Sequence, residues 1–215
     1  MEKKGIIFDF NGTLFWDTPY HDRAWDLFLD NHQISLTKEQ KASKIHGKTN
    51  ADILKGIFDR RLSNLEIETM TLEKEKIYHG ICLQNNMEYA PGAIEFIEYL
   101  KLNKIPYTIA TSSGWENIDF YIQNMELAKW FNIEKIVYND GTFSGKPHPD
   151  IFLKAIDILN INAKNIIIFE DSIAGIQSAE NSGAGEIIIV NSNNGNYGEW
   201  PYRIITDFRE VIGEY

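Results

Sequence analysis

The feature that most constrains the fold of this chain is a short apolar run followed at once by an acid and a glycine turn. The run is Gly5–Phe8, and the hexapeptide after it, residues 9–14, reads DFNGTL. An acid at the carboxyl end of a buried strand, followed by a turn, is where α/β enzymes keep reactive groups. The hexapeptide therefore predicts an α/β fold with a reactive carboxylate, Asp9. It also puts an amide, Asn11, where a second carboxylate is expected to move protons.

Composition excludes several classes of protein. The chain has 215 residues, a net charge of −10 and a pI near 5.0, so it lacks the basic surface that nucleic-acid phosphates require. A small phosphorylated ligand is still compatible, because local cations and a metal can reverse the field inside a cleft. Cys82 is the single cysteine, which excludes an intramolecular disulfide and favours a reducing compartment. No signal peptide or membrane-length apolar run is present, so we expect a soluble, cytoplasmic monomer without nucleic-acid or membrane partners.

Short apolar runs alternate with helical stretches over most of the chain. The runs are largely β-branched, as expected of strands covered on both faces, and the alternation predicts a doubly wound parallel sheet with a Rossmann-like core. Strands are expected at Gly5–Phe8, Tyr107–Ala110, Lys135–Tyr138, Asn165–Phe169, Glu186–Val190 and Arg203–Ile205. Helices are expected at Ala93–Leu102, Trp115–Met125, Pro149–Leu159, Ile173–Ser182 and Phe208–Ile212.

The first two of these strands lie about a hundred residues apart, far more than an ordinary crossover needs. The pattern between them is helical throughout, and the core resumes after a break at Pro91-Gly92. We therefore expect an all-helical cap domain, residues 15–86, inserted into a core made of residues 1–14 and 87–215. Its helices are expected at Tyr20–Asn31, Thr37–Lys44, Ala51–Phe58 and Asn64–Leu83.

Polar residues follow the ends of the predicted strands. In a parallel sheet these ends lie on one edge, where ligands bind, so residues far apart in sequence are expected to converge there. They are Asp9, Thr111, Ser112, Lys146, Glu170 and Asp171.

This combination suggests phosphoryl transfer. Carboxylate oxygens suit Mg²⁺, which holds a phosphate through its oxygens. Thr111 and the Ser112 amide can donate hydrogen bonds to phosphate oxygens, and Lys146 is a point charge that neutralises the phosphate. A carboxylate nucleophile can then form an aspartyl-phosphate and divide one difficult step into two.

Each residue also has an ordinary structural interpretation. A lone aspartate at a strand end is commonly a helix cap or turn residue. Lys146 alone would be a solvated loop lysine, and Glu170-Asp171-Ser172 alone would be the first turn of a helix. The order and spacing of all four groups favour a common site.

Taken together, these motifs resemble the haloacid dehalogenase superfamily of phosphotransferases. DFNGTL is one residue from the usual first motif, and Thr111, Lys146-Pro147 and residues 170–176 (EDSIAGI) match the other three. The resemblance implies that Asp9 is the nucleophile. It also implies Mg²⁺ bound by Asp9, by the backbone carbonyl of Asn11 and by Asp171, with help from Glu170. Thr111, Ser112 and Lys146 would hold the phosphate of a small phosphorylated substrate.

Within the superfamily, the chain looks most like the β-phosphoglucomutases and related sugar-phosphate phosphatases, through residues 17–25 and 145–152. That likeness places His21 and Lys74 where cap residues couple substrate binding to proton transfer. It also places Ser113 on a loop that contacts the non-transferring phosphate.

Two departures concern the distal phosphate. In the stretch from His46 to Asn50, Asn50 takes the position of the mutase's cap arginine, and Lys48 is no bidentate clamp. Gly114 stands where the mutase pattern has a lysine. These departures favour a phosphatase over a mutase.

The cap residues keep bland alternatives. His21 is equally explained as a helix-surface histidine, and Lys74, within Glu73–Lys76, as part of a solvated charged face. The aromatic residues are better explained as cap core than as a substrate cage: Trp16, Trp25, Phe28 and Tyr78.

Asn11 complicates the mechanism, because the residue expected there performs general acid–base catalysis, commonly worth about 10²–10⁴-fold, and an amide cannot. Four explanations stay open. The protein is a slow phosphatase for substrates with good leaving groups, or another residue such as His21 supplies the proton. Alternatively, it is a relative that binds a phosphometabolite without efficient turnover, or Asn11 replaces a natural aspartate by engineering.

Overall fold

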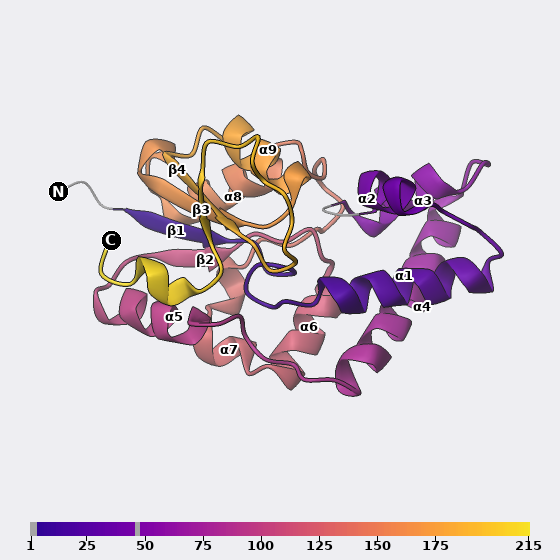
Figure 1. The fold of residues 1–215 in the computed structure, drawn as a ribbon, viewed down its shortest axis with the longest axis horizontal. Coiled ribbons are helices and arrows are strands. Elements are labelled where there is room, and N and C mark those ends of the chain that lie inside the picture. The colour runs from indigo at the N-terminus through magenta and orange to yellow at the C-terminus, as the bar shows by residue number, and fades with distance from the viewer. Residues whose placement is uncertain (1–3, 46–47) are drawn as a thin grey trace.

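The computed structural model describes residues 4–45 and 48–215, and its centre is a five-stranded, all-parallel sheet (Figure 1). The strand order is β2-β1-β3-β4-β5, which puts β1 and its carboxyl end between β2 and β3. The α/β doubly wound prediction is confirmed. The strands are β1 (Gly5–Phe8), β2 (Tyr107–Ile109), β3 (Ile166–Glu170), β4 (Glu186–Val190) and β5 (Arg203–Ile205).

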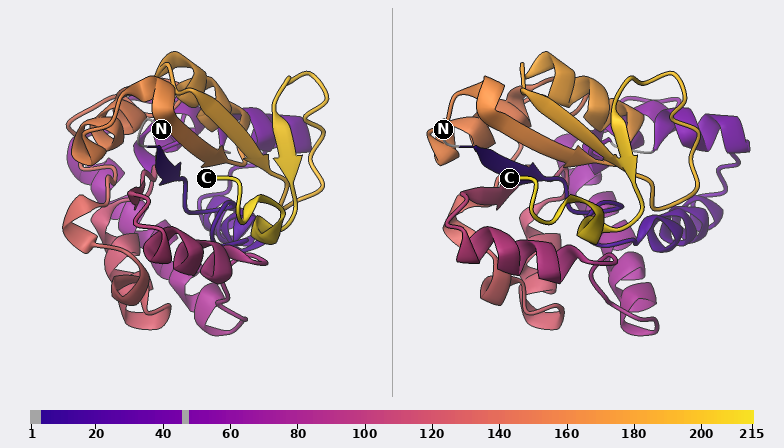
Figure 2. Two further views of the ribbon diagram at one scale, coloured as in Figure 1. Left: turned by 90° about the vertical axis from the view of Figure 1, so that its left-hand side faces the viewer. Right: turned by 60° about the vertical axis from the view of Figure 1, so that its left-hand side comes forward.

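Helices cover both faces of the sheet. Successive residues of a strand point to opposite sides, so each strand contributes side chains to the apolar clusters on both faces. Ile6 and Phe8 of β1 join the apolar cluster beneath α5 (Ala93–Leu102) and α6 (Trp115–Asn124). Ile7 joins the cluster on the other face, under α8 (Asp150–Leu159) and α9 (Ile173–Asn181). Figure 2 shows the sheet between these two layers of helices.

One predicted strand is wrong. Residues 135–138 do not form a strand: a 3₁₀ helix, Ile133–Lys135, precedes a single bridge between Ala110 and Val137. The backbone of Val137 makes two hydrogen bonds at the end of β2: its N–H donates to the Ile109 carbonyl, and its carbonyl accepts from the Thr111 N–H. The N–H of Asn139 then bonds Ser113 instead, so the segment leaves the sheet edge before a ladder can form.

Two helical details also differ. A short helix, α7 (Leu127–Trp130), was not predicted, and the stretch expected as a helix at residues 208–212 is a 3₁₀ helix, Phe208–Val211. Both are single turns, too short for a helical period to stand out in sequence.

Four helices lie between β1 and α5 along the chain, as the sequence predicts. α1 packs along α4, and these helices bury their own apolar cluster, which includes Trp25, Phe28 and Leu54. Phe28 and Tyr78 are core residues, as interpreted, whereas Trp25 is buried in the apolar cluster and also borders a cavity, and Trp16 is half-buried. The four helices are α1 (Thr18–Asn31), α2 (Lys38–Lys44), α3 (Asn50–Ile57) and α4 (Asn64–Leu83).

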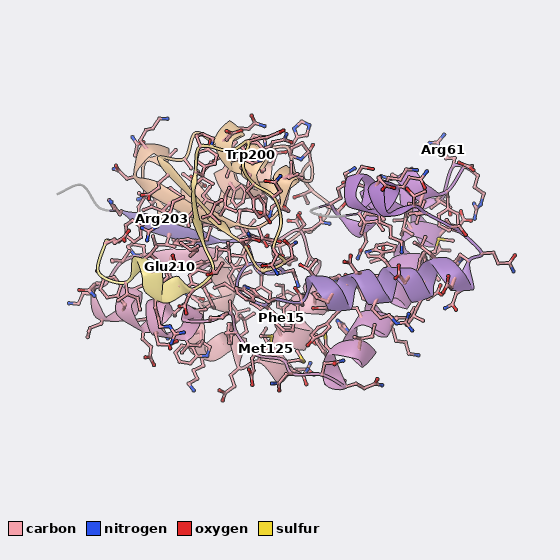
Figure 3. The ribbon with its side chains drawn as sticks, in the orientation of Figure 1. Phe15, Arg61, Met125, Trp200, Arg203 and Glu210 are labelled. Atoms are coloured by element: carbon pink, nitrogen blue, oxygen red, sulfur yellow. The ribbon has the colours of Figure 1, made fainter. Side chains whose placement is uncertain are left out.

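The chain leaves and re-enters the sheet layer at one place. The Ala90 N–H donates to the Leu14 carbonyl at 2.8 Å, and Phe15 bridges to Tyr89. Phe15 is labelled at this junction in Figure 3, whereas Arg61 lies at the far tip of the helical part. The helices α1–α4 therefore attach through two adjacent linkers. The domain boundaries themselves, at residues 14 and 87, stay a prediction.

Candidate active site

The carboxyl ends of the strands bring the predicted polar residues together. Five of them are buried at this edge: Asp9, Thr111, Lys146, Glu170 and Asp171. Asp9, Thr111, Ser112, Lys146 and Asp171 line a cavity of about 660 Å³ between the sheet edge and helices α1, α3 and α4. The convergence arises because β1, β2 and β3 are parallel neighbours whose chains all turn at the same edge.

Lys146 is the central cation of this edge. Its Nζ donates to Asp9 Oδ1 and to Glu170 Oε1, both at 2.5 Å, although the three residues come from separate segments. Burial alone would lower the pKa of Lys146, but Asp9 and Glu170 outweigh it and raise that pKa above its usual range. The lysine therefore stays charged, and the interpretation as a solvated loop lysine is wrong.

The acids outnumber this cation. Burial, with the charge of Glu170, raises the pKa of Asp9 to about 7 against the opposing pull of Lys146. Burial and the charges of Glu170 and Asp9 also raise the pKa of Asp171 well above its usual range. Thr13 Oγ1 donates to Asp171 Oδ1 at 3.0 Å. A further cation near Asp9 and Asp171 would offset this excess of acid.

Two glycines make room for the carboxylates. A Cβ at Gly12, whose φ is +82°, would lie 2.2 Å from Asp171 Oδ2, and a Cβ at Gly175 would lie 1.7 Å from Glu170 Oε1. In the described part of the chain, no three His, Cys, Asp or Glu side chains are arranged as a metal site. A divalent ion would thus rely on the carboxylates of Asp9 and Asp171, a backbone carbonyl and water. Hard oxygen donors of this kind, in acidic excess, fit Mg²⁺.

The hydroxyl groups after β2 lie on the other side of Asp9. Thr111 Oγ1 accepts the Ser113 N–H at 3.2 Å and lies 3.4 Å from Asn11 Oδ1. Ser113 Oγ donates to the same Asn11 oxygen at 2.8 Å, so Ser113 contacts Asn11 here. The Ser112 hydroxyl oxygen is buried and has no hydrogen-bond partner among the described residues, which suits a ligand that accepts a hydrogen bond.

The side-chain amide of Asn11 is hydrogen-bonded through its nitrogen as well as through its oxygen. Its Nδ2 donates to Asp17 Oδ2 and to the Tyr121 hydroxyl, each at 2.6 Å. Asp17 is completely buried and also accepts hydrogen bonds from the Gly12 N–H, at 3.0 Å, and from the Tyr78 hydroxyl. An amide satisfies this position because Asp17 offers only acceptors, whereas a carboxylate would face another carboxylate.

Sequence reasoning missed this network. Burial, with the charge of Asp17, raises the pKa values of Tyr78 and Tyr121 well above their usual range, so both hydroxyls keep their protons. Tyr78 donates to Asp17, and Tyr121 accepts from Asn11. Asp17 lies close after the first motif, separated from it by Phe15 and Trp16, and this proximity is a signal in the sequence that Asp17 lies near the site. The contribution of Tyr121, more than a hundred residues away, has none.

The two predicted cap residues meet in space. Lys74 Nζ lies 2.8 Å from His21 Nδ1, and His21 stacks on Tyr78 with ring centroids 3.9 Å apart. Lys74 is 1% exposed, so its interpretation as part of a solvated face is wrong. His21 is half-buried and lines the cavity, with Nε2 3.3 Å from Asp17 Oδ2. His46 and Gly47, in the stretch compared with the mutase pattern, lie outside the described residues.

The loop after β4 also lines the cavity. Asn193, Gly195, Asn196 and Tyr197 contribute to its wall, and the Tyr197 hydroxyl donates to the backbone carbonyl of Asp171 at 2.5 Å. The sequence carries no signal for this role, because nothing in a short Asn- and Gly-rich stretch indicates which way its loop folds.

The chain belongs to the haloacid dehalogenase-like hydrolase family, whose model matches residues 3–183. Among solved structures, a family IA, variant 3 hydrolase from Entamoeba histolytica HM-1:IMSS is 36% identical. The alignment covers 100% of this chain and 96% of that one, with a TM-score of 0.87. A β-phosphoglucomutase from Clostridium difficile is 23% identical, with coverages of 99% and 95% and a TM-score of 0.81, and so shows the same fold.

A curated relative adds a narrower likeness. Hexitol phosphatase A from Escherichia coli (strain K12) is 28% identical over 115 residues, which is 53% of this chain and 50% of the relative. The chain thus matches about half the length of that relative. Membership of this family identifies the protein as an enzyme of the hydrolase class. No helix in the described part is long and apolar enough to cross a membrane.

Proposed function

We propose that this protein is a Mg²⁺-dependent phosphatase or phosphomutase that acts on a small phosphorylated metabolite, a sugar phosphate, through an aspartyl-phosphate on Asp9. Phosphatase is the favoured activity. The observation that carries the proposal is the buried Lys146, which bridges Asp9 and Glu170 at 2.5 Å beside the hydroxyls that follow β2. Such a cation neutralises a phosphate next to the attacking carboxylate.

In this proposal, an oxygen of Asp9 attacks phosphorus and the bond between phosphorus and the ester oxygen breaks. The ester oxygen takes up a proton, from water or by way of His21, and leaves as the alcohol. Thr111, the Ser112 amide and Lys146 hold the phosphate oxygens during transfer. Asp9, Asp171 and the Asn11 carbonyl would bind Mg²⁺, with Glu170 nearby, and the ion would supply charge stabilisation. Water then attacks the phosphorus of the aspartyl-phosphate and releases inorganic phosphate and free Asp9.

The alternative is a protein that binds a phosphometabolite without efficient turnover. It is favoured by Asn11, whose amide is fully engaged with Asp17, Tyr121 and Ser113 and has no proton to transfer. If the protein is a phosphatase, His21 is the cavity-lining group through which a proton could reach the leaving oxygen.

A phosphate-release screen separates these proposals. The natural chain, Asn11→Asp and Asp9→Ala are assayed with Mg²⁺ across a panel of sugar phosphates. Release by the natural chain that Asp9→Ala abolishes supports the phosphatase. Release by Asn11→Asp alone supports the binding protein or an engineered Asn11. No release from any ester, by either the unsubstituted chain or Asn11→Asp, contradicts the enzyme proposal. A cytoplasmic location, a monomeric state and a cap formed by residues 15–86 belong to this proposal as predictions.

A further inference from the structure

The cavity wall opposite Asp9 carries balanced charge. Among the described residues that line it from α1, α3, α4 and the turn before α3, two acids, Asp22 and Glu75, offset two lysines, Lys48 and Lys74. Lys48 also donates to the Ser43 carbonyl at 2.7 Å. A wall of this kind offers a second phosphate no net positive field.

Glu75 is the unusual member of this wall. Its side chain is 3% exposed, and its Oε1 accepts from Lys74 Nζ at 3.1 Å and from Asn50 Nδ2 at 2.6 Å. Its Oε2 is buried and has no hydrogen-bond partner among the described residues. Burial raises the pKa of Glu75, but Lys74, His21 and Asn50 hold it below its ordinary value.

An ionised carboxylate oxygen that is buried without a hydrogen-bond partner is costly to the fold. Lys74 and Asn50 fix the carboxylate through its other oxygen, so the orphaned Oε2 is presented by a side chain that already lines the cavity. A ligand that donates a hydrogen bond at this place removes the cost.

We propose that Glu75, oriented by Asn50 and Lys74, accepts hydrogen bonds from hydroxyl groups of the substrate's leaving alcohol and disfavours a second phosphate. The substrate class is then the monophosphate ester of an uncharged polyhydroxy compound, a sugar or a polyol. This inference rests on the proposed function, because it assumes that the transferring phosphate lies at Asp9. An ammonium group on the substrate would also pair with Glu75, and that alternative is an outcome of the test.

The test measures kcat/KM for Mg²⁺-dependent phosphate release from four esters. They are sorbitol 6-phosphate, glucosamine 6-phosphate, glucose 1,6-bisphosphate and p-nitrophenyl phosphate, which has no aliphatic hydroxyl. In the natural chain, sorbitol 6-phosphate should be preferred over the other sugar esters. Glu75→Gln should lower kcat/KM for sorbitol 6-phosphate about tenfold or more relative to p-nitrophenyl phosphate, since a hydrogen bond to a charged group is lost.

Glu68→Gln is the matched control. Glu68 lies exposed on the same helix, α4, so this variant removes the same charge away from the cavity and should leave the ratio between the two esters unchanged. Asn50→Arg is a second variant at the wall, and it should raise the relative activity on the bisphosphate. It also keeps the inference testable if Glu75→Gln melts well below the natural chain.

Three outcomes would overturn the inference: an unchanged ester ratio in Glu75→Gln, a preference of the natural chain for glucosamine 6-phosphate, or a preference for the bisphosphate. Phosphate release with an unchanged ratio rejects only this inference. No release from any ester, by the natural chain or by Asn11→Asp, rejects the proposed function instead. In that case, calorimetric titration of sorbitol 6-phosphate with Mg²⁺ into the unsubstituted chain and into Glu75→Gln still decides whether Glu75 binds the polyol.

Discussion

The sheet edge and the helical wall that face each other across the cavity are built in opposite ways. At the sheet edge, Lys146 bonds Asp9 and Glu170, and Asp171 adds a third acid, so acid is in excess among the described residues of this edge. On the wall, Lys74 is paired with Glu75, and the charges balance. The difference suggests that the two sides have separate roles. The sheet edge would bind the phosphate and its metal, and the helical wall would select the leaving alcohol of the substrate.

The two sides also differ in how their side chains are supported. Asp9 follows the buried strand β1, and its N–H donates to the Phe169 carbonyl, while Glu170 ends β3 and pairs with Ile189 of β4. His21, Asn50 and Glu75 stand on helices that pack mainly around a separate apolar cluster. Substitutions at the edge should therefore affect turnover of every substrate, whereas substitutions on the wall should change the choice among substrates.

The largest expected effect is at the nucleophile. Asp9→Asn should reduce phosphate release by roughly 10⁴-fold or more on every ester, because removal of a covalent nucleophile leaves only binding and electrostatic contributions. The measurement is kcat with Mg²⁺ across the panel, with the melting temperature as a control for folding. Residual activity that depended on the substrate would contradict the division between edge and wall.

The next effect runs in the opposite direction. Asn11→Asp should raise kcat by about 10²–10⁴-fold, since it restores an acid–base group. It should also lower the melting temperature, because the new carboxylate replaces the amide that donates to Asp17 at 2.6 Å. Steady-state kinetics and thermal unfolding of the same preparation test both halves. A variant that is more active and equally stable would show that Asp17 does not resist an acid at this position.

A pair of glycines compares the packing of the two sides. Gly175→Ala should destabilise the fold by about 1–3 kcal/mol and impair turnover, because the added Cβ would lie 1.7 Å from Glu170 Oε1. Gly80→Ala, in the helix α4 and with nothing within 4 Å of the added Cβ, should stabilise it by about 0.5–1 kcal/mol. Denaturant unfolding measures both. Equal effects of the two substitutions would refute the difference in packing.

The smallest effect concerns the loop after β4. Tyr197→Phe removes the hydroxyl that donates to the Asp171 carbonyl, and a hydrogen bond of this type is worth about 1 kcal/mol. The Mg²⁺ concentration for half-maximal activity should therefore rise a few-fold. Tyr202→Phe is the control, since it removes a hydroxyl bonded to Glu180 instead, and it should leave the Mg²⁺ dependence unchanged.

Much of the fold follows from local pattern. Apolar runs such as Glu186–Val190 are fully specified by short-range hydrophobicity, and the structure has this strand with the same bounds. The helix Asn64–Leu83 also agrees in both bounds, and a capping box between Ser63 and Glu66 marks its start. The stretch at residues 135–138 has a strand-like composition but pairs at one residue only, because pairing depends on where the chain turns next.

For this protein, the sequence alone determined the family, the parallel sheet and the group of polar residues at its carboxyl edge. It could do so because the ends of parallel strands share an edge, whatever the details of packing. Only the tertiary structure decided that Lys74 is buried against His21, that Asn11 is bonded to Asp17 and Tyr121, and that Glu75 has an unpaired oxygen. These facts depend on contacts between segments far apart in the chain, and no local spacing encodes which side chains such contacts bring within hydrogen-bond distance.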